Sequence, residues 1–163
     1  MAQCVLVDTN AIIEAVRTGC WSAIAAHFEL ETVEECRAES LRGDSTRPSY
    51  VSVTEAQLDL AATRPVTAVQ RATLALRCAC ADGLDDGERD LIAHAIARPD
   101  EWQLCSPDKA SIRAAVELGC HERLVSLELL ARRAGVRPDP PLYDHHSERR
   151  LGEWRTAALL GML

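Results

Sequence analysis

The chain has no long apolar stretch and no excess of positive charge. None of its 163 residues belongs to a run approaching the roughly 18 apolar residues of a membrane span. The opening segment MAQCVLVDTN has neither a basic leader nor a long apolar core, so we expect a cytoplasmic protein with no membrane partner. The formal net charge of −7 argues against broad, non-specific binding to nucleic acid, which normally uses a basic face.

The seven cysteines lack the regular spacing of a disulfide framework or of paired zinc ligands. Only Cys78 and Cys80 lie close together in the sequence. We therefore expect reduced thiols in the core or at the surface. A chain of this length can bury roughly two thirds of its unfolded surface, so it needs neither a disulfide nor a structural metal to fold.

Apolar runs alternate with amphipathic segments, which is typical of an α/β fold with a mainly parallel sheet. We predict a three-layer α/β/α sandwich with a sheet of four to five strands. The expected strands are residues 3–8, 28–31, 102–106 and 123–126. A helix is expected directly after Asp8-Thr9-Asn10, and the others at 32–42, 55–62, 66–80, 87–98, 109–118 and 127–134.

Local signals mark the ends of several of these helices. Thr32 and Glu35 have the T-x-x-E spacing of a capping box, and Ser126 and Ser147 precede helical periodicity. Gly119 and Gly135 stand where glycine commonly ends a helix.

The proline-rich stretch after residue 136 ends the compact pattern. We expect residues 1–136 to form one domain and residues 137–163 to form a linker and a C-terminal helix. Leu151, Trp154, Ala158 and Met162 recur at helical spacing in this tail. The tail should therefore pack on its own domain or on a partner subunit in a homodimer.

Four acidic residues stand where an α/β fold would bring them together. Asp8 ends the first apolar run, and Asp108 follows the run at 104–106; Glu35 and Asp90 lie near the starts of helical segments. Ligands of parallel sheets bind at the carboxyl ends of the strands, so we expect one acidic cluster there. Gathered carboxylates repel one another unless a cation lies between them, and oxygen ligands favour Mg²⁺ or Mn²⁺.

The segments that carry these acids also resemble those of a known family. VLVDTNAII, TVEEC, DDGERDLIAHAIA and LCSPDKA occur in the order and approximate spacing of the PIN-domain ribonucleases, over about residues 3–130. The resemblance implies a PIN-like fold and a Mg²⁺- or Mn²⁺-dependent endoribonuclease that hydrolyses RNA. It assigns the catalytic and metal-binding roles to Asp8, Glu35, Asp90 and Asp108.

The same family implies partners besides RNA. Its members are frequently dimers, and it includes the toxins of bacterial toxin–antitoxin pairs, which implies an antitoxin protein. The chain departs from the small toxins by a longer middle, at about residues 42–85, and by its tail after Pro138. Both a toxin and a processing nuclease therefore remain open.

Two of the four assignments have an alternative close by. Glu39 lies one helical turn after Glu35 and could take the second role, and Glu88 could share the third role with Asp90. We favour Glu35 and Asp90.

Other polar residues are expected to support the site. Asn10 and Ser106 would orient Asp8, Asp108 or a bound water. Arg42 and Arg47, in a polar loop, could contact a substrate phosphate.

Histidines and tryptophans contribute little to this interpretation. We expect His145 and His146 to be solvated, and the three tryptophans to serve packing. The leading hypothesis is a metal-dependent ribonuclease. The alternative is a PIN-like module that binds RNA or protein without turnover.

Overall fold

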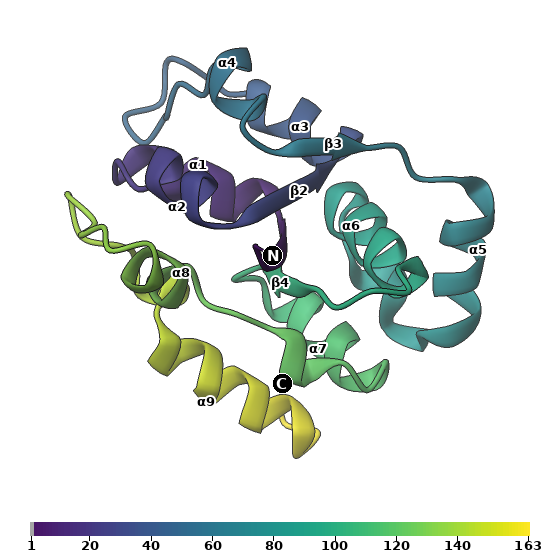
Figure 1. Ribbon diagram of the computed structural model, residues 1–163. Coiled ribbons are helices and arrows are strands. Elements are labelled where there is room, and N and C mark those ends of the chain that lie inside the picture. The colour runs from purple at the N-terminus through teal and green to yellow at the C-terminus, as the bar shows by residue number, and fades with distance from the viewer. Residues whose placement is uncertain (1) are drawn as a thin grey trace.

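The protein, described by a computed structural model over residues 2–163, is an α/β structure built on one parallel sheet (Figure 1). In the described residues the four strands are β1 (Cys4–Val7), β2 (Glu29–Val33), β3 (Ala62–Arg64) and β4 (Gln103–Cys105). Their order is β3-β2-β1-β4, and every neighbouring pair is parallel. The carboxyl ends of all four strands therefore lie at the same edge of the sheet.

Helices fill the connections between and after the strands. They are α1 (Thr9–Arg17), α2 (Trp21–His27), α3 (Glu34–Leu41), α4 (Glu55–Leu58), α5 (Ala68–Arg77), α6 (Asp86–Ala97), α7 (Lys109–Glu117), α8 (Leu127–Arg133) and α9 (Glu148–Leu159). Three short 3₁₀ segments are η1 (Ala79–Gly83), η2 (His121–Arg123) and η3 (Asp144–His146). None of these helices is long and apolar enough to cross a membrane, so the described residues contain no candidate span.

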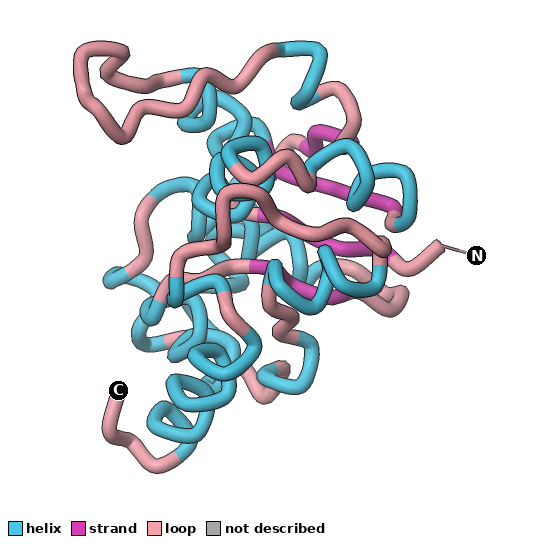
Figure 2. Tube along the Cα trace, turned by 90° about the vertical axis from the view of Figure 1, so that its left-hand side faces the viewer, coloured by secondary structure: helices cyan, strands magenta, loops and turns pink. Residues whose placement is uncertain are grey.

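Figure 2 shows the strands of the sheet, in magenta, lying one beside another. The core consists of two apolar clusters, one on each face of this sheet. Alternation along β1 sends Val5 and Val7 to one face and Cys4 and Leu6 to the other. The Val5 face is covered by α1, α2, α4 and α8. The Leu6 face is covered by α3, α6 and α7, and α5, η1 and α9 add residues to the same apolar cluster. The predicted α/β class with a parallel sheet is confirmed, and its four strands fall within the predicted number.

The strand predictions were incomplete at the two edges of the sheet. β3 was missed because its three residues, Ala62–Arg64, are exposed or half-buried and carry no apolar pattern. The helix predicted at 55–62 ends at Leu58, where the chain turns into this strand. At the other edge, the strand predicted at 123–126 is reduced to a single parallel bridge between Leu124 and Leu104.

The predicted capping box at Thr32 is wrong. Thr32 is the fourth residue of β2, and its hydroxyl donates a hydrogen bond of 2.9 Å to the carbonyl of Val7 in β1. Helix α3 therefore begins after Val33, without a side-chain cap. Helix α2 was also missed; it has seven residues and no side-chain cap at Cys20.

Other helix-end predictions are confirmed. The hydroxyls of Ser126 and Ser147 accept the amides of Leu129 and Arg150 and so cap α8 and α9. Gly119 and Gly135 have φ angles of 72° and 69°, the left-handed conformation that glycine adopts most easily.

The C-terminal segment docks on the same chain. Helix α9 lies beside α7 and α8 along one edge of the molecule (Figure 1). Leu151 is buried, and Trp154 and Ala158 pack against the Leu6-face cluster, whereas Met162 is exposed. Ahead of α9, the amide of Tyr143 donates a 2.7 Å hydrogen bond to Glu14 of α1, which fixes the linker against the domain.

A buried acid ties the sheet to the end of α6. The Glu31 side chain in β2 is 1% exposed, forms ion pairs with Arg64 and Arg98 and shares a hydrogen bond with His94. Burial alone would raise the pKa of Glu31, but hydrogen bonds from these three partners outweigh it and hold the pKa below its ordinary value of 4.5. The ionised carboxylate therefore stabilises the fold above pH 4.5, and this contribution is lost as the pH falls below that value.

We predict that Glu31→Gln destabilises the protein by about 3 kcal/mol at pH 7, because it leaves the partly buried Arg98 without this counter-charge. The difference from the wild type should shrink as the pH falls towards 3. Urea denaturation at both pH values measures it. Glu29→Gln, on an exposed position of the same strand, is the matched control and should change stability by less than about 0.5 kcal/mol. Equal effects of the two substitutions would contradict the prediction.

Candidate functional site

Two aspartates meet at the carboxyl edge of neighbouring strands. β1 and β4 are paired so that Val7 lies opposite Cys105, and Asp8 follows Val7 directly. Asp8 caps α1 by accepting the amide of Ala11 at 2.7 Å. Asp108 caps α7 by accepting the amide of Ala110 at 2.9 Å. The strand pairing and the two caps thus fix both carboxylates at one edge of the sheet.

The start of α6 adds two more acids. Asp85 caps this helix by accepting the amide of Glu88 at 2.8 Å, and Glu88 accepts the amide of Asp85 at 3.2 Å in return. The Glu88 side chain is buried, and its Oε1 has no hydrogen-bond partner among the described residues. A buried carboxyl oxygen without a partner is costly, so this atom is a candidate to bind a ligand.

Glu39 reaches the same place from α3. Its Oε2 accepts a 2.7 Å hydrogen bond from the hydroxyl of Thr9, and its carboxylate also accepts the amide of Gly87 in the first turn of α6. A Cβ at residue 87 would lie 2.5 Å from Oε2, so only glycine allows this approach. We call the group of Asp8, Glu39, Asp85, Glu88 and Asp108 the acidic cluster.

Burial and repulsion between carboxylates raise the pKa values of Asp8, Glu39 and Glu88. Burial raises the pKa of Asp8 from 3.8 to about 7. Hydrogen bonds from Ser106 and Ala11 oppose this shift, and the charges of Asp108 and Asp85 add to it. Burial and then the charges of Asp108, Asp85 and Asp8 raise the pKa of Glu88 from 4.5 to about 8. The pKa of Glu39 is also raised, mainly by burial. A divalent cation between these groups would relieve the repulsion.

Ser106 and Asn10 lie beside the cluster in different ways. The hydroxyl of Ser106 donates a 2.6 Å hydrogen bond to Oδ2 of Asp8, and its oxygen lies 3.5 Å from the amide of Asp108. Ser106 therefore holds Asp8 and links the two strand ends. Asn10 is exposed and borders an open cleft instead.

This cleft adjoins the cluster at Asp108 and has a volume of about 560 Å³. Its walls are the start of α7 and the beginning of α9 with the residues before it. The residues that line it are Asn10, Pro107, Asp108, Lys109, Asp144, His145, Arg150 and Trp154. The Nζ atom of Lys109 lies 5.1 Å from the centre of the Trp154 ring.

The structure places Glu35 and Asp90 apart from the arrangement expected for them. Asp90 is engaged by Arg71 of α5 through two hydrogen bonds of 2.6 Å. Asp90 lies two residues after Glu88, which is about 200° around a helix, so the two side chains leave α6 on different sides. Glu35 is paired at 3.2 Å with Arg42, while Glu39, one turn further along α3, reaches Thr9 and Gly87. These contacts favour Glu39 and Glu88 as the free carboxylates, and the roles of all four residues stay predictions.

The structure also shows where the expected substrate-binding arginines and the two adjacent histidines lie. Arg42 and Arg47 are exposed and paired with Glu35 and Asp44, and neither is seen at the cluster. His145 is exposed as expected, but His146 is buried, and burial lowers its pKa to about 4.

Sequence reasoning missed two features of the site. It did not single out Asp85, although the spacing D-x-x-E from Asp85 to Glu88 is that of a capping box. Trp154 was expected to serve packing alone, but it also borders the cleft.

Comparison of the chain with family models, with curated proteins and with solved structures gave no match.

We predict that Asp8→Asn stabilises the metal-free protein at alkaline pH. Because the folded-state pKa of Asp8 is raised to about 7, the unfolded chain loses its proton first. Stability then falls as the pH rises from about 4 to 7 and stays low above that range. The substitution removes this loss, so the gain should reach about 2 to 4 kcal/mol at pH 8 and be small at pH 4.

Thermal denaturation in the presence of a chelator measures this difference. Glu101→Gln removes one exposed charge and serves as the matched control. A gain for Asp8→Asn that is the same at both pH values would show that the carboxyl group does not titrate as described.

Proposed function

We propose that the chain is a Mg²⁺- or Mn²⁺-dependent endoribonuclease whose acidic cluster holds the cation. The observation that carries this proposal is the buried Oε1 atom of Glu88, which has no hydrogen-bond partner among the described residues. The acidic cluster consists of carboxylates, and hard divalent cations prefer oxygen ligands. The raised pKa values of Asp8 and Glu88 support the same conclusion, because both carboxyl groups lack a compensating positive charge.

Hydrogen bonds hold some carboxylates of the acidic cluster in place, and others can be reached from solvent. Asp8 is held by the amide of Ala11 and the hydroxyl of Ser106, so its carboxylate is preorganised. The caps of α6 and α7 each use Oδ1 of an aspartate, which leaves Oδ2 of Asp85 and Asp108 to face a ligand. Asp85 is exposed and Asp108 half-buried, so the cluster can be reached from solvent.

A divalent cation would supply the Lewis acidity that phosphodiester hydrolysis needs and neutralise charge on the phosphate. Glu88, with a pKa of about 8 in the absence of a cation, can hold a proton near neutral pH. Hydrogen bonds from Thr9 and Gly87 hold the Glu39 carboxylate in place against repulsion from the neighbouring carboxylates.

The cleft beside Asp108 supports a nucleic-acid substrate. It combines the chain's only lysine, Lys109, with the ring of Trp154 and with Arg150, which is paired with Asp144 and Glu153. Amino and guanidinium groups bind phosphates, and an aromatic ring can stack on an unpaired base. The choice of single-stranded RNA over DNA and an antitoxin partner depend on the resemblance to PIN-domain ribonucleases. A homodimer and a cytoplasmic site of action also stay predictions.

We predict metal-dependent cleavage of a mixed RNA pool by the wild-type protein, abolished by chelation. Asp8→Asn and Glu88→Gln should each lower the rate by roughly a hundredfold or more, because each removes a ligand of the cation. Glu35→Gln and Asp90→Asn are the matched controls from the same two helices. Each should stay within about threefold of the wild type when circular dichroism shows a folded protein.

The outcome separates the competing hypotheses. Loss of activity in Glu35→Gln and Asp90→Asn, with activity kept in Glu88→Gln, would contradict the acidic cluster as the site. A pure wild-type protein that binds Mn²⁺ and RNA but cleaves nothing would favour the non-catalytic binding module.

A further inference from the structure

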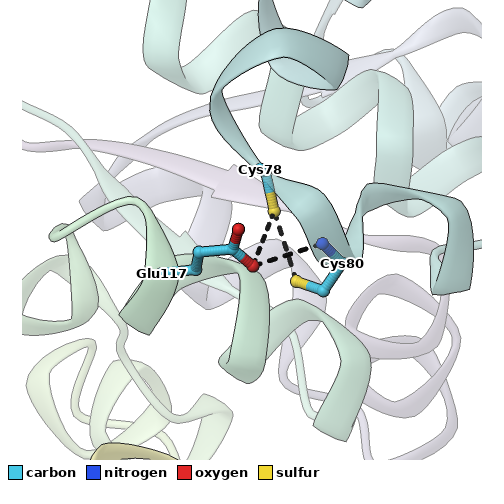
Figure 3. Close-up of side chains that lie close together, drawn as sticks. All are labelled: Cys78, Cys80 and Glu117. Atoms are coloured by element: carbon cyan, nitrogen blue, oxygen red, sulfur yellow. Dashed lines mark hydrogen bonds between the residues drawn. The ribbon is translucent and has the colours of Figure 1, made fainter.

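A second group of metal-ligating atoms lies between η1 and the end of α7, and it is independent of the acidic cluster. Cys78 and Cys80 flank the start of η1, and Glu117 is the last residue of α7 (Figure 3). One ligand atom from each lies within 4.8 Å of the other two. Sequence analysis found no zinc-type spacing of cysteines because the third member comes from a distant helix.

The distances in this group approach those of a tetrahedral metal site. The two sulfur atoms are 3.2 Å apart, and Oε2 of Glu117 lies 3.6 Å from the sulfur of Cys78. With Zn–S bonds of about 2.3 Å and a Zn–O bond of about 2.0 Å, tetrahedral ligands lie about 3.8 Å (S to S) and 3.5 Å (S to O) apart. The two sulfurs must separate slightly, and the third pair, Cys80 and Glu117, lies within 4.8 Å. Cys80 is half-buried on a short 3₁₀ turn.

The carboxylate of Glu117 is already oriented for this role. The backbone amides of Ala79 and Cys80 both donate hydrogen bonds to it, as the dashed line to the Cys80 amide in Figure 3 shows in part. Hydrogen bonds of this kind fix a ligating carboxylate in one orientation. Burial is graded across the group, with Cys78 buried, Cys80 half-buried and Glu117 exposed, so a cation could enter from solvent and keep one position open.

We propose that Cys78, Cys80 and Glu117 form a binding site for Zn²⁺, with two thiolates, one carboxylate and an open fourth position. Two thiolates select a thiophilic ion over the hard ions suited to the acidic cluster. Binding converts both thiols to thiolates and releases two protons to solvent. The ion joins η1, which leads into α6, to α7.

The test uses the full chain, reduced with a phosphine and freed of metal, with Co²⁺ as a spectroscopic probe of the zinc site. One equivalent of Co²⁺ should give a thiolate-to-cobalt charge-transfer band, and Zn²⁺ should displace it. Cys80→Ser and Cys78→Ser should each remove most of the band. Glu117→Gln should keep a thiolate band but weaken the affinity by roughly tenfold or more.

Two controls separate this site from its surroundings. Cys120→Ser changes a half-buried thiol near the same helix end, and Asp8→Asn changes the acidic cluster; both should leave the band unchanged. Because Glu117 is exposed, Glu117→Gln keeps the test decisive if Cys78→Ser does not fold.

Three results would overturn the proposal. One is the absence of a charge-transfer band in the reduced wild-type protein. Another is a band that survives Cys80→Ser or disappears with Cys120→Ser. The third is a pair of thiols that only oxidises to a disulfide in air, while the reduced protein binds no Zn²⁺.

Discussion

Repulsion between carboxylates at the carboxyl edge of the sheet is the constraint around which the rest of the site is arranged. Three helices, α1, α6 and α7, begin with an aspartate cap, at Asp8, Asp85 and Asp108. Parallel pairing of β1 with β4 fixes two of these helix starts side by side. Each cap satisfies backbone amides at a helix start, where the dipole also favours negative charge. The fold therefore gathers negative charge through interactions that stabilise its helices one at a time.

Glu39 and Glu88 show that this arrangement requires more than capping. Glu39 needs a glycine at residue 87 and a hydroxyl at residue 9 to approach α6. Glu88 contributes one oxygen to the capping box and leaves the other buried without a partner among the described residues. Such an atom costs free energy in the metal-free protein, and protein sites with this cost are commonly functional. The proposed divalent cation would recover this free energy.

The sequence predicted the fold class and the strands β1 and β4 better than the strand β3. β1 and β4 were found because short buried apolar runs end in an acid at each, and the α/β class followed from their alternation with helices. β3 could not be found, because Ala62–Arg64 pairs through its backbone and has no apolar pattern. Thr32 was misassigned because its hydroxyl bonds to the neighbouring strand rather than to a helix start, and a local motif cannot show a partner 25 residues away.

The candidate site was predictable only where its residues follow the ends of apolar strands. Asp8 and Asp108 follow from strand ends, which sequence patterns locate well. The choice between Glu88 and Asp90 depends on Arg71, which comes from another helix and engages Asp90. The choice between Glu35 and Glu39 depends on the contact with Thr9. In both cases a tertiary contact, which the sequence does not show, determines which carboxylate is engaged by a neighbour.

The most direct test of this account is a crystal of the protein soaked in Mn²⁺, with anomalous diffraction recorded at the manganese absorption edge. The account predicts a peak in the anomalous difference map bounded by Asp8, Glu88 and Asp108, and none beside Asp90. A map without a peak in the acidic cluster at saturating Mn²⁺, or with its peak at Asp90 and Glu35, would contradict it.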